Sequence, residues 1–188
     1  MRRPDSGHMS LRNAFTTCTL ILGFLLVAPA AQACEGQALE QPFTQWGDLA
    51  DYTLVGDGDL TAGAAGWELD GAELVDDNEP WYVHGGDTPS ALRLRAGDSA
   101  RTPPMCVTLL HPTMRFFVRG GGLLKVEVVT GDGLTLPIGI VLGDGEWAPS
   151  PPLPVVGNLL DDEVSFRFSP LLGTSTIDDV YVDPYKKG

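Results

Sequence analysis

The sequence predicts an all-β protein, a single antiparallel β-sandwich that follows a cleaved signal peptide. No amphipathic helical stretch appears after the first 33 residues, and glycine or proline interrupts almost every window of about ten residues. Short segments of alternating apolar and polar residues recur instead. Alternation gives each strand one dry and one wet face, which is typical of antiparallel sheets packed face to face.

The expected strands follow one another at intervals of roughly 8 to 15 residues, the spacing of a β-sandwich. Four segments alternate cleanly, with apolar positions at Leu92 and Leu94; Met114, Phe116 and Val118; Leu124, Val126 and Val128; and Val164, Phe166 and Phe168. Six weaker segments are Trp67–Leu69, Ala72–Val75, Trp81–His84, Cys106–Leu110, Ile138–Leu142 and Ile177–Val182. The proline-rich stretch Glu146–Gly157 is expected as a loop or edge segment, because proline cannot pair within a sheet.

The first 33 residues are typical of an export signal. Three arginines precede an uncharged apolar run at Phe15–Ala30, and small residues at Ala31 and Ala33 suit a signal peptidase. The apolar run has 16 residues, fewer than the roughly 20 of a membrane-spanning helix. We therefore expect residues 34–188 to form one secreted domain, extracellular or associated with the cell wall.

The secreted part of the chain is strongly acidic. Residues 34–188 carry 9 basic and 24 acidic side chains, a net charge of -15. Nucleic acids and anionic lipids need cationic surfaces, so this balance argues against both as partners. The charge is expected to keep the protein soluble, and binding of a cation by some of the carboxylates is the alternative.

The two cysteines that remain after cleavage, Cys34 and Cys106, are expected to form a disulfide in an oxidising compartment. Two independent thiols are the alternative. Lipid attachment at Cys34 is less favoured, because Ala31 and Gln32 depart from the usual lipidation signal.

Motifs of known catalytic sites do not occur in this sequence. It lacks a nucleophile elbow, a His-Glu-x-x-His zinc motif and a Walker phosphate loop. The stretch Asp57–Glu68 partly matches a calcium loop of the EF-hand kind, but Ala62 replaces the required glycine, so a chance match is favoured. An enzyme that cleaves glycans with two facing carboxylates stays the least favoured hypothesis.

Aromatic residues beside turns are the best candidates for ligand binding. Indole rings stack on the apolar faces of sugars, and the candidates are Trp81, Tyr82 and Trp147. Arg115 and Arg119 are expected as polar partners, on an outer face where they flank the ring of Phe117. Core packing is the alternative for each tryptophan, and a merely solvated outer face is the alternative for the arginines.

The closing segment "TSTIDDVYVDPY" contains two adjacent aspartates within a predicted strand. Simple alternation places Asp178 on the core face with Val180 and Val182, near the rim of the sheet. It places Asp179 on the solvent face, where replacement by alanine should not lower stability. Asp178 is expected to need a cation or backbone amides as partners.

Two segments, "DLTAGAAGWELDGAELV" (Asp59–Val75) and "STIDDVYVDP" (Ser175–Pro184), resemble the opening and closing strands of carbohydrate-binding-module-like jelly rolls of the galactose-binding superfamily. The stretches "QPFTQWGD", "NEPWYVHG", "HPTMRFFVR" and "IDDVYVDP" more closely resemble secreted actinobacterial proteins of unknown function. The first resemblance implies a jelly-roll fold, and in that superfamily a structural calcium often lies between the first strand region and the last strand. Its ligands here would be Asp178 with Asp59 or Asp57, since Leu60 and Thr61 replace the usual glutamate region.

These observations together predict a secreted, non-catalytic module that binds carbohydrate or another cell-envelope component. A structural or adhesive envelope protein that contacts other proteins is the alternative. The oligomeric state and the identity of the ligand do not follow from the sequence.

Overall fold

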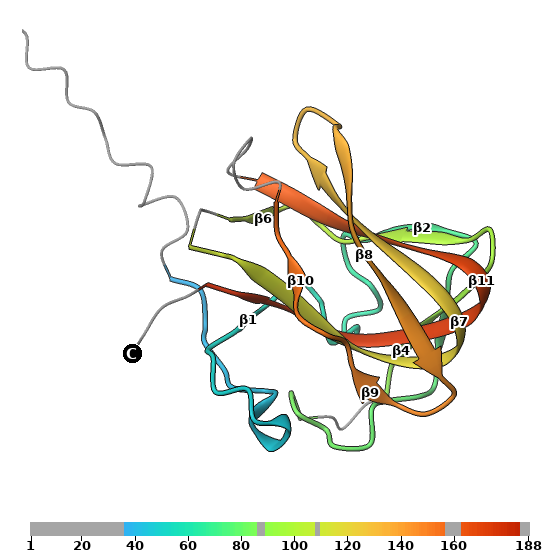
Figure 1. The fold of residues 1–188 in the computed structure, drawn as a ribbon, viewed down its shortest axis with the longest axis horizontal. Coiled ribbons are helices and arrows are strands. Elements are labelled where there is room, and N and C mark those ends of the chain that lie inside the picture. The colour runs from blue at the N-terminus through green and yellow to red at the C-terminus, as the bar shows by residue number, and fades with distance from the viewer. Residues whose placement is uncertain (1–35, 86–88, 108–109, 157–162, 185–188) are drawn as a thin grey trace, which may run out of the picture.

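The computed structural model describes residues 36–85, 89–107, 110–156 and 163–184, and within these ranges the chain is almost entirely β-strand (Figure 1). One short 3-10 helix, η2 (Thr44–Trp46), lies in the N-terminal segment. The strands are β1 (Thr53–Leu54), β2 (Glu68–Asp70), β3 (Glu73–Val75), β4 (Ala91–Arg95), β5 (Ser99–Arg101), β6 (Met105–Cys106), β7 (Thr113–Thr130), β8 (Thr135–Asp144), β9 (Ala148–Pro149), β10 (Leu153–Pro154) and β11 (Glu163–Asp183). These strands pair antiparallel, which confirms the predicted fold class.

The long strands β7 and β11 pair with each other and organise the sheet. In Figure 1 both run to the right-hand end of the molecule, bend there and return. A Cβ atom at Gly120, Gly122 or Gly173 would lie 2.1, 2.0 or 2.1 Å from a carbonyl oxygen of the opposite strand. Only glycine fits such a close approach, so these three residues place the corner of the sheet.

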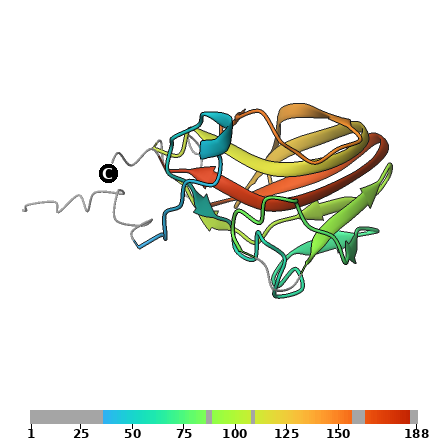
Figure 2. The ribbon, with the colours of Figure 1, turned by 90° about the horizontal axis from the view of Figure 1, so that it is seen from below.

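The corner divides the sheet into two layers. Layer A combines residues 113–119 of β7 with residues 174–183 of β11, flanked by β9 and β10 on one side and by β4 and β3 on the other. Layer B combines residues 122–130 of β7 with residues 163–170 of β11, flanked by β8 on one side and by β5 and β2 on the other. Figure 2 shows β7 and β11 curving around together at the end where the layers meet.

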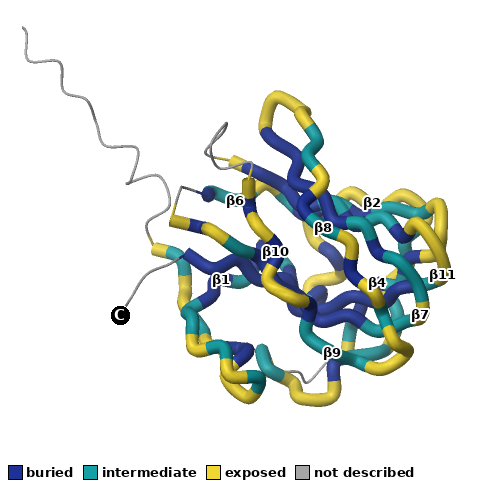
Figure 3. The backbone as a smooth tube through the Cα atoms, viewed as in Figure 1, coloured by how far each residue is buried: buried dark blue, intermediate teal, exposed yellow. Residues whose placement is uncertain are grey.

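The main hydrophobic core lies between the two layers, and Figure 3 shows the buried central strands. The inner faces contribute the residues that the four cleanly alternating segments predict, namely Leu92, Leu94, Met114, Phe116, Val118, Leu124, Val126, Val128, Val164, Phe166 and Phe168. Each of them is at most 4 % exposed. The period-two pattern therefore identifies the core face correctly in both layers.

Several strand boundaries differ from the predicted ones. The predicted strands around residues 114–118 and 124–128 are one strand, and those around 164–168 and 177–182 are another, because the glycine corner bends the sheet without ending the pairing. The segment Trp81–His84 is not a strand but a turn-rich loop, and the prediction was wrong there. The proline-rich stretch supplies the short edge strands β9 and β10, as expected.

Some predictions fall on parts of the chain that are not described. The signal peptide, residues 1–33, and Cys34 lie outside the described residues. Cys106 is disulfide-bonded, but its pairing with Cys34 stays a prediction. Within the described ranges, no helix has the length and the apolar character needed to span a membrane.

Candidate functional site

A second aromatic cluster covers the outer face of layer A. It joins Phe117 of β7 and Tyr181 of β11 to Phe43 and Tyr52 of the N-terminal segment, and all four are at most 1 % exposed. Phe43 stacks on Phe117 with ring centroids 5.3 Å apart and meets Tyr181 edge to face at 5.8 Å. The N-terminal segment thus packs as a third layer, coloured blue in Figure 1.

The predicted exposed position of Arg115 was wrong, because the N-terminal segment covers this face of layer A. The side chain is buried rather than exposed beside a free Phe117 ring. Its Nε donates to the carbonyl oxygen of Ser150 at 2.9 Å, its Nη1 pairs with Asp48 at 2.7 Å, and its guanidinium lies 4.3 Å from the centroid of Phe43. Arg115 therefore fastens the N-terminal segment to layer A and does not reach the surface for ligand binding.

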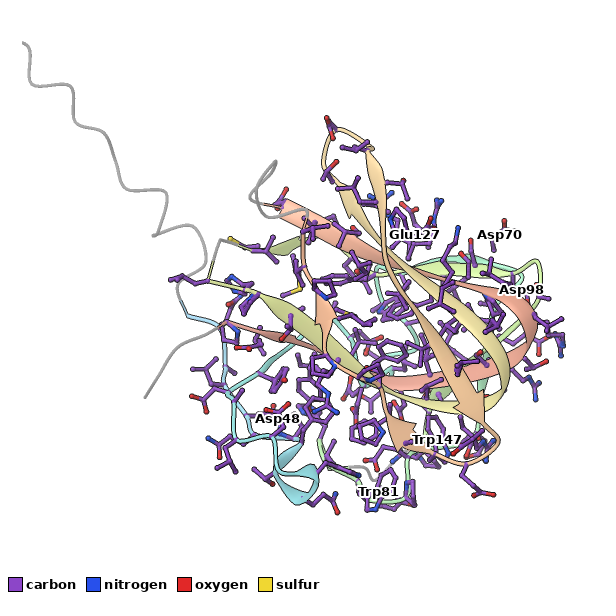
Figure 4. The ribbon with its side chains drawn as sticks, viewed as in Figure 1. Asp48, Asp70, Trp81, Asp98, Glu127 and Trp147 are labelled. Carbon is purple, nitrogen blue, oxygen red and sulfur yellow. The ribbon has the colours of Figure 1, made fainter. Side chains whose placement is uncertain are left out.

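Three tryptophans gather at the edge of this cover, and we call Trp46, Trp81 and Trp147 the tryptophan patch. Trp46 and Trp81 meet edge to face at 4.8 Å, and both contact the ring of Phe117, at 5.3 and 5.6 Å. Trp147 packs against the same cluster. Figure 4 labels Trp81 and Trp147 at the same end of the molecule, below β9 and beside it.

The patch presents aromatic surface to solvent. Trp81 is 37 % exposed and the adjacent Tyr82 is 51 % exposed, which agrees with the predicted exposure of both. Trp147 is partly buried, and its indole Nε1 has no hydrogen-bond partner in the described structure. Contacts of its ring, and no hydrogen bond of its indole N–H, therefore hold Trp147 in the described structure.

Arg119 flanks the patch, as the sequence predicts. Its guanidinium lies 5.4 Å from the ring centroid of Trp147, and its side chain is 40 % exposed. The same group forms an ion pair with Asp77. The cation is thus neutralised on one side and remains available as a hydrogen-bond donor on the other.

A buried glutamate holds the loop that carries Trp81. Glu79 is 0 % exposed, and its Oε2 and Oε1 accept the backbone N–H groups of Trp81 at 2.5 Å and of Val83 at 2.6 Å. The backbone N–H of Glu79 in turn donates to Asp178 of β11 at 3.2 Å. Charge-assisted hydrogen bonds of this kind fix backbone geometry, so the position of Trp81 is set from beneath the loop.

Replacing Glu79 with glutamine should loosen this loop. A glutamine side chain has one acceptor oxygen for the two N–H groups of Trp81 and Val83, and its amide would face the second N–H as a donor. A buried unsatisfied group costs about 1–3 kcal/mol, so we expect the free energy of unfolding to fall by about that amount. Chemical denaturation would measure it, with Glu68→Gln as control, since the Glu68 side chain is 71 % exposed.

The adjacent aspartates of β11 are both buried, at 1 % and 3 % exposure for Asp178 and Asp179. The pairing register shifts between Asp178 and Tyr181, and Asp179 has a positive φ of 49°, so a β-bulge interrupts the alternation. Asp178 consequently faces the loop of Glu79 together with Tyr181, not the core with Val180. The predicted solvent position of Asp179 was wrong for the same reason.

Burial raises the pKa of both aspartates to about 8. For Asp179, the charges of Asp178 and Glu79 raise the pKa further. Burial alone would lower the pKa of the nearby His84, but its 3.0 Å contact with Glu40 and the charges of Asp59 and Asp179 raise it overall. The region under the loop is therefore a network of titratable groups, in which the two aspartates are buried and His84 and Glu40 are partly exposed.

The predicted calcium ligands do not converge on one point. Both carboxylate oxygens of Asp57 accept backbone N–H groups of its own loop, from Ala62 at 2.9 Å and Ala65 at 2.6 Å. Asp178 likewise accepts two backbone N–H groups, and Asp59 bonds to Thr61. Among the described residues, no group of three or more acidic, histidine or cysteine side chains is arranged to hold a metal. Calcium binding stays a prediction, and these residues do not fit it.

Sequence reasoning missed Glu79 and the role of Trp46. Nothing in the local pattern shows that Glu79 is buried, because its burial depends on packing against distant β11, where its backbone N–H donates to Asp178 across 99 residues of sequence separation. Trp46 lies on a 3-10 turn whose position against Phe117 is a tertiary feature. The one available signal was the placement of Glu79 directly before Pro80, Trp81 and Tyr82.

Described in these terms, the molecule is an antiparallel β-sandwich with an aromatic surface patch. No family profile matches the sequence, and neither does any curated protein. The solved structures that it resembles include carbohydrate-binding modules, as the sequence resemblance predicted. The likeness to them is one of fold alone.

A family 29 carbohydrate-binding module has a TM-score of 0.46 and 15% identity, with 72% of this chain and 93% of that chain covered. The CBM22-1 and GH10 modules of Clostridium thermocellum xylanase 10B have a TM-score of 0.48 and 14% identity, with 66% of this chain and 27% of that chain covered. The enzymatically active domain of tailspike protein 4 from bacteriophage CBA120 gives 0.46 and 12%, with 69% and 21% covered. The present chain thus spans only a minor part of the last two, and likeness at this level carries no information on function.

Proposed function

We propose that this protein is a secreted, non-catalytic module that binds a saccharide through the tryptophan patch. The observation that carries the proposal is the exposed ring of Trp81 on a loop that buried Glu79 clamps through two hydrogen bonds. A rigid, exposed indole can stack on a sugar ring without a cost for ordering its loop. An indole on a flexible loop would lose conformational entropy when it binds, which would weaken binding.

The surroundings of the patch suit a polyhydroxylated ligand. Tyr82 supplies an exposed hydroxyl group beside Trp81, and the guanidinium of Arg119 supplies N–H donors beside Trp147. Polar groups at the rim of apolar surfaces are typical of sites that orient sugar hydroxyls.

The burial of three neighbouring carboxylates supports the non-catalytic part of the proposal. Glu79, Asp178 and Asp179 are each at most 3 % exposed, beneath the loop of residues 79–84. A catalytic acid or base must come within hydrogen-bond reach of the reacting atoms, and these three groups face backbone amides and one another instead.

The direct test is retention by polysaccharides in native affinity electrophoresis, with xylan, mannan and galactan as soluble probes. We expect at least one of these neutral polymers to slow the protein. Trp81→Ala and Trp147→Ala should each weaken retention about tenfold, because each removes a stacking surface. Leu142→Ala is the matched control, since this leucine of β8 is 76 % exposed and lies in layer B, away from the patch.

Two results would overturn the proposal. One is the failure of a glycan array to retain the wild-type protein on any saccharide. The other is retention by both tryptophan variants at the level of Leu142→Ala. Either result would favour the alternative of an adhesive protein that contacts other proteins.

A further inference from the structure

The outer face of layer B carries a row of four charged side chains on neighbouring strands. In register, Glu68 of β2 lies opposite Arg101 of β5, Arg101 opposite Arg167 of β11, and Arg167 opposite Glu127 of β7. Residues directly opposite in an antiparallel pair have Cβ atoms about 4.5–5.5 Å apart. The two arginines at the centre of the row are therefore direct neighbours of like charge, which is destabilising on its own.

The acids at the ends of the row neutralise this pair only in part. Glu127 forms its ion pair with Lys125 at 2.8 Å rather than with Arg167. Glu68 reaches Arg101 only at 3.5 Å, with its side chain 71 % exposed. In the described parts of the chain, the side chain of Arg167 makes neither an ion pair nor a hydrogen bond.

Three polar atoms of this face are buried without a partner in the described structure. They are the Nε atoms of Arg101 and Arg167 and the Oγ of Ser165, which lies two residues from Arg167 on the same face of β11. Native proteins rarely leave such donors unpaired, because each costs about 1–3 kcal/mol. Two guanidinium Nε–H groups and a hydroxyl that lack acceptors are together complementary to an oxyanion.

We propose that Arg101 and Arg167, with Ser165, form a site for an oxyanion, the carboxylate or sulfate group of an acidic saccharide. An anion between the two guanidinium groups removes their mutual repulsion and accepts their N–H groups in a forked geometry. The acids at both ends of the row limit the site to one anionic group at a time, as a free group or as one group of a chain.

This site is separate from the tryptophan patch and goes beyond the function proposed for it. The patch lies on the outer side of layer A, whereas the arginine pair lies on the outer side of layer B. Figure 4 labels Glu127 at the opposite end of the view from Trp81 and Trp147. A test of one surface therefore leaves the other intact.

The experiment compares polygalacturonate with its fully methyl-esterified form in affinity electrophoresis of the full chain. The two polymers share one backbone, and esterification replaces each carboxylate with a neutral methyl ester. We expect polygalacturonate to retain the wild-type protein more strongly than the ester does, with retention that falls as salt is added. Arg167→Gln and Arg101→Gln should each weaken this retention about 10- to 100-fold, as expected for loss of a hydrogen bond to a charged group.

Arg93→Gln is the control, because Arg93 lies on the outer face of layer A and already pairs with Glu73 at 2.9 Å. Its retention should equal that of the wild type. Thermal unfolding shows whether each variant is folded, and Arg167→Gln should not lower the melting temperature, since it removes a like-charge contact. To separate the two oxyanions, dextran sulfate is compared with polygalacturonate, and binding of either one by the arginine pair supports the site.

The site is refuted if the esterified polymer is retained as strongly as polygalacturonate, or if Arg167→Gln and Arg93→Gln behave alike. It is also refuted if the wild-type protein binds neither charged polymer. Loss of neutral-polymer binding in Trp81→Ala alone bears on the tryptophan patch and leaves the oxyanion site standing, so the two proposals fail by different observations.

Discussion

Replacing Phe117 with alanine is expected to lower the free energy of unfolding by about 3–5 kcal/mol, the cost of deleting a fully buried aromatic side chain. Phe117 is 0 % exposed and lies at the centre of the second aromatic cluster. The centroid of its ring lies 5.3 Å from the ring centroid of Phe43, 5.3 Å from that of Trp46 and 5.6 Å from that of Trp81. The substitution therefore removes the surface on which both the N-terminal segment and the tryptophan patch rest.

Phe116→Ala is a matched control for this variant. Phe116 is the neighbouring residue of β7, is also 0 % exposed, and points into the main core, where it meets Phe168 edge to face at 5.0 Å. We expect a similar loss of stability by chemical denaturation from both variants. Only Phe117→Ala should also allow rapid proteolysis within residues 37–52 under native conditions and weaken retention by neutral polysaccharides.

Equal protection of residues 37–52 in the two variants would show that the N-terminal segment does not depend on the cluster. Should the alanine variant fail to fold, Phe117→Leu keeps part of the volume and allows the same comparison at a smaller cost.

The contrast between Phe116 and Phe117 shows what the sequence could predict about this fold. Alternation identified Phe116 as a core residue and Phe117 as its outward neighbour, and both assignments to a face of β7 are right. Whether an outward face meets solvent depends on what covers it. The N-terminal segment covers this face with Phe43 and Tyr52, which lie in short, irregular stretches. No periodic pattern of apolar residues there predicts that the segment packs against β7.

The closing strand shows a second limit. Simple alternation through residues 177–182 put Asp178 on the core face and Asp179 in solvent, whereas the bulge after Asp178 buries both beneath the loop of Glu79. A bulge inserts one residue and reverses the phase of the strand beyond it, and no turn residue marks this one. The turn beside Trp81 and the outward position of Arg119 could be predicted from local sequence. The contact of Arg119 with Trp147, the buried position of Arg115 and the row of Arg101 and Arg167 depend on strand pairing and register.

The buried aspartates should make the protein less stable as the pH rises from about 5 to about 8. The pKa of Asp178 and of Asp179 is about 8 in the folded protein, against 3.8 as the ordinary value. Between those limits the folded state holds protons that the unfolded state has lost, so unfolding becomes easier with increasing pH. The free energy of unfolding falls by at most about 1.4 kcal/mol per pH unit for each aspartate. The stabilisation by the bound proton is fully present below the ordinary pKa of 3.8 and is lost above the folded pKa of about 8.

Other titratable groups do not reverse this trend. The raised pKa of His84 contributes stability that is also lost as the pH increases, through the folded value. Hydrogen bonds lower the pKa of Asp48 and Asp132, and their contribution changes only at pH values below about 4. Among the groups with a shifted pKa, the buried pair and His84 are those that change charge between pH 5 and pH 9.

Asp179→Asn is the decisive variant for this expectation. Asparagine tolerates the left-handed backbone that Asp179 adopts at φ 49°, and it removes the like charge beside Asp178. We expect the variant to melt several degrees higher than the wild type at pH 8–9, with a flatter dependence on pH, since about 1 kcal/mol shifts the melting temperature of a domain this size by about 2–4 °C. Asp70→Asn removes the same charge from an exposed position of β2, labelled in Figure 4, and should change neither quantity. An unchanged dependence of the melting temperature on pH in Asp179→Asn would mean that Asp179 takes up no proton in the folded protein over this pH range. That result would contradict the expectation.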